Sequence, residues 1–382
     1  MNVTLAFGLF LLILFSVGVI GQKMFKIPDI LLFIALGIFI SPFFHEIKVI
    51  EAAGEVGLVL LFFLLGMKFP LKNLGAGSKK VWKAGLLDAV LGIVATTVLS
   101  RLFGLEWKEA LLIGGIVFAT SSSITAKLLE DKNRAETNES EFILLVLVFE
   151  DLVAPILLTV LIGFRGGDFT FSDFGFILTK IVLLAVVAVA LSKVLFKRIE
   201  HFLESIKHED SFIVLVAGIA LTYGGIAILL GLSEVIGAFL AGIMLSDVMV
   251  KEKIAKVTLP VRNIFLPFFF LSFGMQIKLT AEIPYLTLLI VLLFWSVAQK
   301  IMVGYFGGRW YGLSKRESLS SGLSLTQRGE FSVIMAGLAA GHLKIFAGIY
   351  ILVIALLGTI LFQAAPKLNR AIFSKVAERK ED

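Results

Sequence analysis

Apolar segments of about membrane-spanning length follow one another along the whole chain, and short polar stretches separate them. A transmembrane helix needs roughly 20 predominantly apolar residues, and thirteen segments come near that length. The pattern predicts an all-α polytopic membrane protein with about 13 transmembrane helices. The expected spans are residues 3–21, 28–43, 55–67, 84–103, 109–131, 141–164, 174–196, 211–230, 233–249, 259–277, 284–308, 317–340 and 344–364.

Composition agrees with a membrane protein and limits the kinds of functional site that the chain can form. Hydrophobic residues make up 58% of the chain and charged residues only 17%, against roughly 25% charged in soluble domains. The first apolar segment lacks a basic start and a small-residue cleavage site, so residues 1–22 are expected to be a retained transmembrane helix. There is no cysteine and the four histidines lie near polar segments. No cofactor is therefore expected, and an enzyme is disfavoured because only serines and carboxylates remain as catalytic groups.

Lysine and arginine are distributed unequally between the two sides of the membrane. If the N-terminus lies outside, 26 basic residues fall in inner segments and 6 in outer segments, and Lys180, Lys300 and Arg328 lie inside spans. This asymmetry predicts a cytoplasmic C-terminus in a cell (inner or plasma) membrane. It also explains the net charge of +6, so no nucleic-acid partner is expected. Residues 197–210 place apolar side chains on one helical face and form either an interfacial helix or an ordinary charged loop.

Two pairs of segments indicate an internal repeat. "PDILLFIALGIFIS" (28–41) is matched by "SEVIGAFLAGIMLS" (233–246), and "LLFFLLGMKF" (60–69) by "FFFLSFGMQI" (268–277). The shift is seven helices, and an odd shift inverts the orientation, as in secondary transporters. The expected organisation is an N-terminal helix 1–22, a first inverted repeat 28–165, a linker helix and interfacial segment 174–210, a transmembrane helix 211–230, a second repeat 233–364 and a short cytoplasmic tail 365–382.

Polar residues interrupt two apolar helices at corresponding places in the repeats. The first interruption, in "FATSSSITAK" (118–127), contains Thr120, Ser121 and Ser122, and the second, in "LSLTQRGEFS" (323–332), contains Gln327, Arg328 and Glu330. Unwound backbone at membrane depth is tolerated only where it is buried in protein or lines a wet cavity. The paired positions predict two crossed discontinuous helices. The alternative is that the hydroxyls bond back to their own helix.

Two carboxylates lie in the middle of the apolar stretch 142–164. Glu150 lies 9 residues after Glu141, and Lys300 lies 9 residues before Arg309. At about 1.5 Å per residue both are about 13 Å from the cytoplasmic end, so an ion pair between them is expected. Asp151 lies about 100° further round its helix and is expected to bind a cation or a proton.

Other charges inside the spans leave more than one interpretation open. The Glu150–Lys300 pair could serve only to hold helices together. Arg328 could pair with Glu330 through unwound backbone or could balance Glu150. Asp88 is expected to be an interfacial or helix-packing residue, and Lys180 is expected to extend toward the membrane surface.

Four motifs, "TSSSITAKLLED" (120–131), "FEDLVAPILL" (149–158), "LPFFFLSFGMQI" (266–277) and "LTQRGEFSVI" (325–334), occur in order along the chain. Together they resemble the monovalent cation:proton antiporter-2 family, which includes NapA-type and Kef-type Na⁺ or K⁺/H⁺ antiporters. The resemblance implies an antiporter fold with two inverted repeats and a homodimer in membrane lipid. It implies that Asp151 is the ion- and proton-binding carboxylate, that Lys300 partners residue 150, and that Thr120, Ser121 and Ser122 form the first polar break.

One position departs from that family. Residue 150 is Asp in the NapA type and Gln in the Kef type, whereas here it is Glu. Because the acidic pair is retained, the expected function is Na⁺/H⁺ exchange by alternating access with competition at Asp151. The alternative is a K⁺/H⁺ antiporter or K⁺ efflux system of the Kef type. A channel is disfavoured because no carbonyl-filter motif is present, and a receptor because the loops are too short for an output domain.

Overall fold

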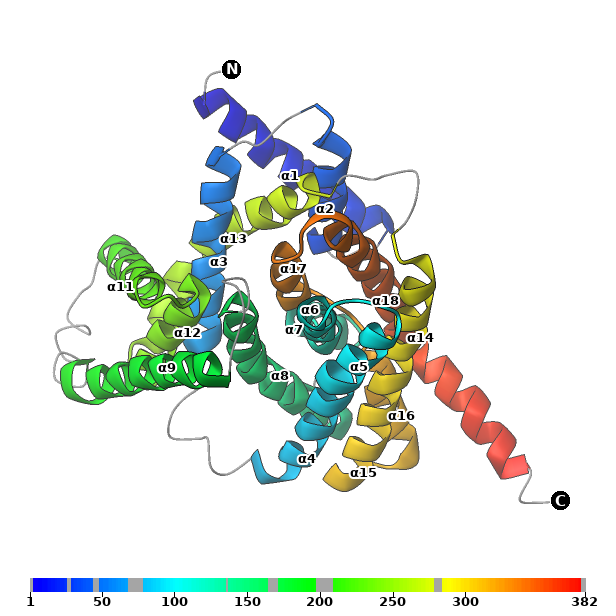
Figure 1. The fold of residues 1–382 in the computed structure, drawn as a ribbon. Coiled ribbons are helices and arrows are strands. Elements are labelled where there is room, and N and C mark those ends of the chain that lie inside the picture. Colours follow the sequence, from blue (N-terminus) through cyan, green and yellow to red (C-terminus); the bar gives the residue numbers. More distant parts are fainter. Residues whose placement is uncertain are drawn as a thin grey trace. The chain divides into compact units, whose positions relative to one another are not determined.

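A computed structural model describes residues 3–25, 29–43, 48–67, 78–134, 137–163, 171–196, 209–277 and 284–378. Its described residues are almost entirely helical (Figure 1). The chain divides into two compact units, each made of two separate stretches of sequence. Unit 1 comprises Met1–Ala76 and Pro155–Lys278, and unit 2 comprises Gly77–Ala154 and Leu279–Asp382.

In unit 1, helices from the two halves of the sequence pack against one another. Helix α13 packs on α2 and α3, and α12 packs on α3, α9 and α11. The bounds of these helices are α1 Val3–Phe25, α2 Asp29–Ile40, α3 Lys48–Met67, α9 Phe171–Leu191 with a π-helical turn η4 Ser192–Phe196, α11 Glu209–Leu229, α12 Glu234–Met244 and α13 Lys251–Met275.

Glycines of the sequence repeat allow the closest of these contacts. A Cβ at Gly37 of α2 would lie 2.9 Å from the Cα of Gly274 in α13, and a Cβ at Gly242 of α12 would lie 2.9 Å from the Cα of Gly66 in α3. Gly37 corresponds to Gly242 in the repeat, and Gly66 corresponds to Gly274. The matched segments therefore make reciprocal contacts, each with the partner segment of the other half.

Replacing Gly242 with Ala is expected to destabilise unit 1. The added methyl group would meet the carbonyl oxygen of Phe63, and overpacking of this kind costs about 1–3 kcal/mol. The measurement is thermal unfolding of the purified protein in detergent. The control is Gly8→Ala in α1, where a Cβ would meet no atom within 4 Å and where Ala favours the helix by about 1 kcal/mol. Equal melting temperatures for the two variants would contradict the close contact.

Unit 2 contains the two interrupted helices. Helix α6 lies beside α17 (Figure 1), and α16 packs against α14 and α18, which also contact each other. Helix α8 begins in unit 2 and continues past the division at Pro155. The bounds are α4 Ser78–Ala89, η2 Val90–Ala95, α5 Thr96–Leu102, α6 Trp107–Phe118, α7 Ser122–Asp131, α8 Asn138–Gly163, α14 Leu286–Met302, η5 Val303–Gly307, α15 Gly308–Tyr311, α16 Lys315–Ser324, α17 Glu330–Gly337 and α18 Gly341–Glu378.

The helices match the predicted spans in position more closely than in length. Each of the thirteen predicted segments overlaps a helix, and seven helices of the described part are long and apolar enough to cross a membrane. The count of thirteen spans stays a prediction.

Helices α3, α4 and α13 begin six to eight residues earlier than predicted, in polar sequence. Helix α18 continues through Pro366 to Glu378, so the predicted tail 365–382 is helical over most of its length. Most of the predicted interfacial segment, 197–208, lies outside the described residues.

Candidate functional site

The two predicted interruptions are present, and they meet. Between α6 and α7 the chain is not helical from Ala119 to Ser121, and between α16 and α17 it is not helical from Leu325 to Gly329. Thr120 and Arg328 form an antiparallel β-bridge, and the Ser121 N–H donates to the Gln327 carbonyl at 3.0 Å. Backbone groups freed by one break are therefore satisfied by the other.

Side chains add further hydrogen bonds at the place where the two breaks meet, which we call the junction. The Ser332 hydroxyl lies 2.8 Å from the Ile116 carbonyl and 3.1 Å from the Ala119 carbonyl at the end of α6. The Ser121 hydroxyl donates to Glu330 Oε2 at 3.2 Å, and the Thr125 hydroxyl lies 3.5 Å from Gln327 Oε1. Helices α7 and α17 both begin at this junction, so their partly positive N-terminal ends are directed at it.

Lys300 is the centre of a buried ionic cluster beside the junction. Its ammonium lies 2.7 Å from Asp88 Oδ1, 3.0 Å from Glu150 Oε1 and 3.0 Å from the Phe118 carbonyl. These partners use all three ammonium donors. Lys300 and Asp88 are fully buried and Glu150 is 1% exposed. The predicted pair of Glu150 with Lys300 is thus present, as part of a larger group with two carboxylates.

Thr120 links this cluster to the first break. Its N–H donates to Glu150 Oε2, and its hydroxyl lies 3.0 Å from Glu150 Oε1 and 3.1 Å from the Leu325 carbonyl. Both oxygens of Glu150 therefore have hydrogen-bond donors. The geometry fixes the glutamate between the broken helix and Lys300.

Asp88 is the site residue that the sequence interpretation missed. The sequence predicts an interfacial or helix-packing residue at this position. Asp88 is fully buried and paired with Lys300, which agrees with helix packing but adds a role in the ionic cluster that the sequence interpretation does not include. The reason is the start of α4 at Ser78, six residues before the predicted span. Ten residues of helix separate Asp88 from that end, about 15 Å along the helix axis, and the 2.7 Å contact puts Asp88 beside Lys300. A lone carboxylate in an apolar span was the signal that could have identified it.

The remaining predicted residues lie around the same junction. Asp151 is 6% exposed on α8, next to Glu150, whereas Ser122 at the start of α7 is partly exposed. Arg328 is fully buried and donates to the carbonyl of Thr326 at 3.1 Å. Its expected pairing with Glu330, or its balancing of Glu150, stays a prediction.

The arrangement has more buried acids than bases. Among the side chains that the structure describes, four carboxylates, of Asp88, Glu150, Asp151 and Glu330, are buried around the breaks with two basic side chains, of Lys300 and Arg328. Such an excess favours uptake of protons or of a monovalent cation. Within the described residues no group of three or more His, Asp or Glu side chains is arranged to hold a metal ion.

Comparisons with known proteins agree with this geometry. The model of the family described as "Sodium/hydrogen exchanger, transmembrane" matches residues 10–367. The ammonium/H⁺ antiporter subunit AmhT of Alkalihalophilus pseudofirmus is 48% identical over 97% of this chain and 95% of its own. The K⁺/H⁺ antiporter subunit KhtU of Bacillus subtilis is 28% identical over 97% and 95%.

A solved structure has the same fold. The sodium proton antiporter MjNhaP1 of Methanocaldococcus jannaschii superposes with a TM-score of 0.72 at 21% identity, over 95% of this chain and 98% of its own. At that level of identity the likeness concerns the fold alone.

Proposed function

The chain belongs to the sodium/hydrogen exchanger family, and from that premise we propose that its cargo is a monovalent cation of the size of K⁺ or ammonium. The chain is a multi-pass membrane protein that exchanges a monovalent cation for protons. The proposal concerns which cation, which residues carry it, and how the two flows are coupled.

The observation that carries the choice of cation is the set of hydrogen bonds that Glu150 accepts. If both Glu150 and Asp151 could bind the ion, the site would favour Na⁺, which binds best where several strong oxygen ligands converge. Glu150, however, already accepts from Lys300 and from the N–H and hydroxyl of Thr120. Because these bonds engage both oxygens of Glu150, we place the ion at the neighbouring Asp151 rather than between the two acids, and a weaker field suits a larger, less strongly hydrated cation. The names of AmhT and KhtU, which specify ammonium and K⁺, support the same choice.

We propose that Asp151 binds the proton and the cation alternately. A protonated carboxyl group has no net charge to attract a cation, and a bound cation favours the ionised form. The same site therefore cannot hold both, and alternate opening to the two sides of the membrane couples the flows. Thr120, Ser121 and Ser122 are proposed to supply hydroxyl and backbone ligands from the first break, with Gln327 and Glu330 on the second.

Lys300 is proposed to act as a charge switch between Glu150 and Asp88. The two carboxylates share one ammonium, so a proton gained by one of them changes the strength with which Lys300 is held by the other. Arg328 is proposed to keep the net charge of the junction low.

Several finer features are also part of the proposal. We assign the chain to the antiporter-2 branch, with NapA-like and Kef-like relatives, on its four motifs. The reciprocal contacts of Gly37 with Gly274 and of Gly242 with Gly66 support two inverted repeats. A homodimer and an N-terminus outside the membrane are proposed, the latter from the distribution of basic residues.

The test is a comparison of cations in proteoliposomes containing the purified protein. Proton flux driven by gradients of NH₄⁺, K⁺, Na⁺ or Li⁺ is followed with a pH-sensitive dye, with and without a voltage clamp. We expect half-maximal flux at concentrations roughly tenfold lower for K⁺ or NH₄⁺ than for Na⁺, equivalent to about 1.4 kcal/mol. A preference for Na⁺ or Li⁺ would instead support the small-cation alternative, and equal flux in protein-free liposomes would mean that ammonia permeation had been measured.

A further inference from the structure

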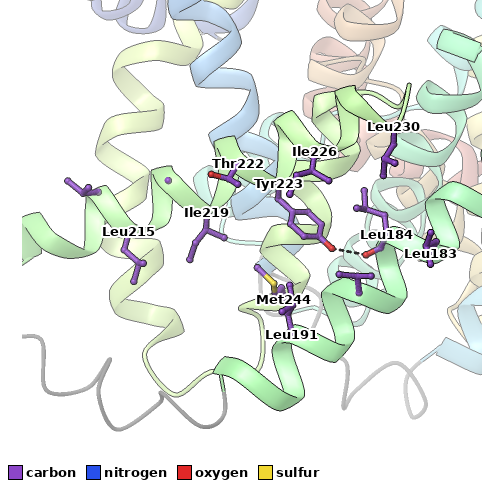
Figure 2. A pocket seen from close by; sticks show the side chains of 13 residues that line it. Leu183, Leu184, Leu191, Leu215, Ile219, Thr222, Tyr223, Ile226, Leu230 and Met244 are labelled. Carbon is purple, nitrogen blue, oxygen red and sulfur yellow. Dashed lines mark hydrogen bonds between the residues drawn. The ribbon is translucent and has the colours of Figure 1, made fainter.

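An apolar groove lies in unit 1, and none of its lining residues belongs to the ionic cluster of unit 2. It runs between α9 and α11, both of which pack against α12 (Figure 2). Its volume is about 650 Å³, within the range of roughly 300–1,000 Å³ that is usual for small-molecule sites. Leu183, Val187 and Leu191 line it from α9, and Val214, Ile219 and Ile226 line it from α11.

The groove offers almost no polar group to an occupant. Thr222 and Tyr223 carry the side-chain hydroxyls of its lining, and the Tyr223 hydroxyl already donates to the Leu184 carbonyl at 2.8 Å (Figure 2). Its outer walls are open, since Val214 is 73% exposed and Leu183 is 58% exposed. Because Ser211–Leu229 is a candidate membrane span, we expect the exposed side chains of α11 to face hydrocarbon.

The lining of the groove suits a flexible apolar occupant. Empty apolar space forfeits dispersion contacts. A hydrocarbon chain can adjust its torsions to fill a groove of about 650 Å³.

Lys180 places a positive charge at one end of this groove. It precedes Leu183 and Leu184 by three and four residues on α9, so it shares their face. Its ammonium donates to the carbonyl of Leu230, which also lines the groove, at 2.7 Å. It also lies 4.4 Å from the centre of the Phe176 ring. Both partners are neutral, and in the described part of the chain no carboxylate pairs with Lys180.

We propose that this groove binds one acyl chain of an anionic membrane phospholipid, whose phosphate contacts the Lys180 ammonium. A lysine within an apolar helix is costly unless an anion or water accompanies it. An anionic head group joined to a hydrocarbon chain matches the cation and the adjoining apolar groove together. A small soluble anion would satisfy only Lys180, and a neutral lipid only the groove. This lipid site is independent of which cation the antiporter carries.

The test compares phosphatidylglycerol with phosphatidylcholine carrying identical acyl chains. Retention of each lipid by the purified full-length protein is measured by native mass spectrometry. We expect phosphatidylglycerol to bind roughly fivefold more tightly, as one basic residue near a membrane surface provides. Lys180→Gln should abolish this preference. Lys251→Gln, which removes an exposed lysine of α13, should keep it.

Two glycines of α11 provide a matched test of the groove itself. A Cβ at Gly218 or at Gly225 would meet no atom within 4 Å, but only Gly218 lines the groove. Gly218→Leu should reduce retention of both lipids by about tenfold, whereas Gly225→Leu should retain them. Equal affinity of the wild type for both lipids, or a preserved preference in Lys180→Gln, would overturn the proposal. So would a Gly218→Leu protein that keeps its lipid but loses its oligomeric state, because the groove would then be a subunit contact.

Discussion

Replacing Asp151 with Asn is expected to abolish cation-driven proton flux. The substitution preserves the size of the side chain but removes the charge for which the proton and the cation compete. The neighbouring cluster is left intact, because Lys300 bonds to Asp88 and Glu150 rather than to Asp151 in the contacts described above. Loss of a single ion ligand at membrane depth should lower exchange by at least about 100-fold, equivalent to ~2.7 kcal/mol.

The measurement is the dye-based flux assay in proteoliposomes, at equal protein density and with thermal unfolding as the check on folding. The matched control is Glu141→Gln, on the same helix but at its exposed first turn. Gln can still accept the hydrogen bond from the Tyr311 hydroxyl, which lies 2.8 Å from Glu141. If Asp151→Asn exchanged cations for protons at the rate of Glu141→Gln, the ion would have to bind elsewhere and the mechanism proposed here would be wrong.

Much of this site could be predicted because a charged residue inside a membrane can pair only with a charge at a similar depth. A helix rises about 1.5 Å per residue, so counting residues from the ends of two apolar segments was enough to place Glu150 level with Lys300. Two polar interruptions at matched positions of a repeat were enough to predict that backbone from Thr120 and Arg328 would be unwound. Both inferences use local sequence and a single length scale.

Asp88 shows where such counting fails. The predicted span began where the sequence turns apolar, but α4 continues into the polar residues at Ser78, because a helix can extend beyond the hydrocarbon region. The error moved Asp88 by more than one turn toward the membrane surface. The contacts of Arg328 were also beyond sequence reasoning, since a bond to the carbonyl of Thr326, two residues earlier, arises only in the non-helical backbone of the break.

Replacing Lys300 with Met is expected to cause the largest loss of stability. It leaves Asp88 and Glu150 buried near one another without their shared cation, and breaking a buried ion pair from one side typically costs 3–5 kcal/mol. The second substitution Asp88→Asn should recover a large part of that loss, because it removes one of the two unbalanced carboxylates. A melting temperature lowered by roughly 10 °C in Lys300→Met is expected, from about 2–4 °C per kcal/mol in larger domains.

The measurement is a double-mutant cycle of thermal unfolding in detergent, with Lys251→Met as the control for an exposed lysine. Additive effects of the two substitutions would mean that Asp88 and Lys300 are not coupled, contrary to the 2.7 Å contact. Flux measured on the same proteins then separates the two roles considered for this cluster. If the ion pairs only hold helices together, the stabilised double variant should exchange ions like the wild type. If Lys300 switches between the carboxylates, the double variant should fold but transport poorly. It has no ammonium group that can change its carboxylate partner when a proton binds.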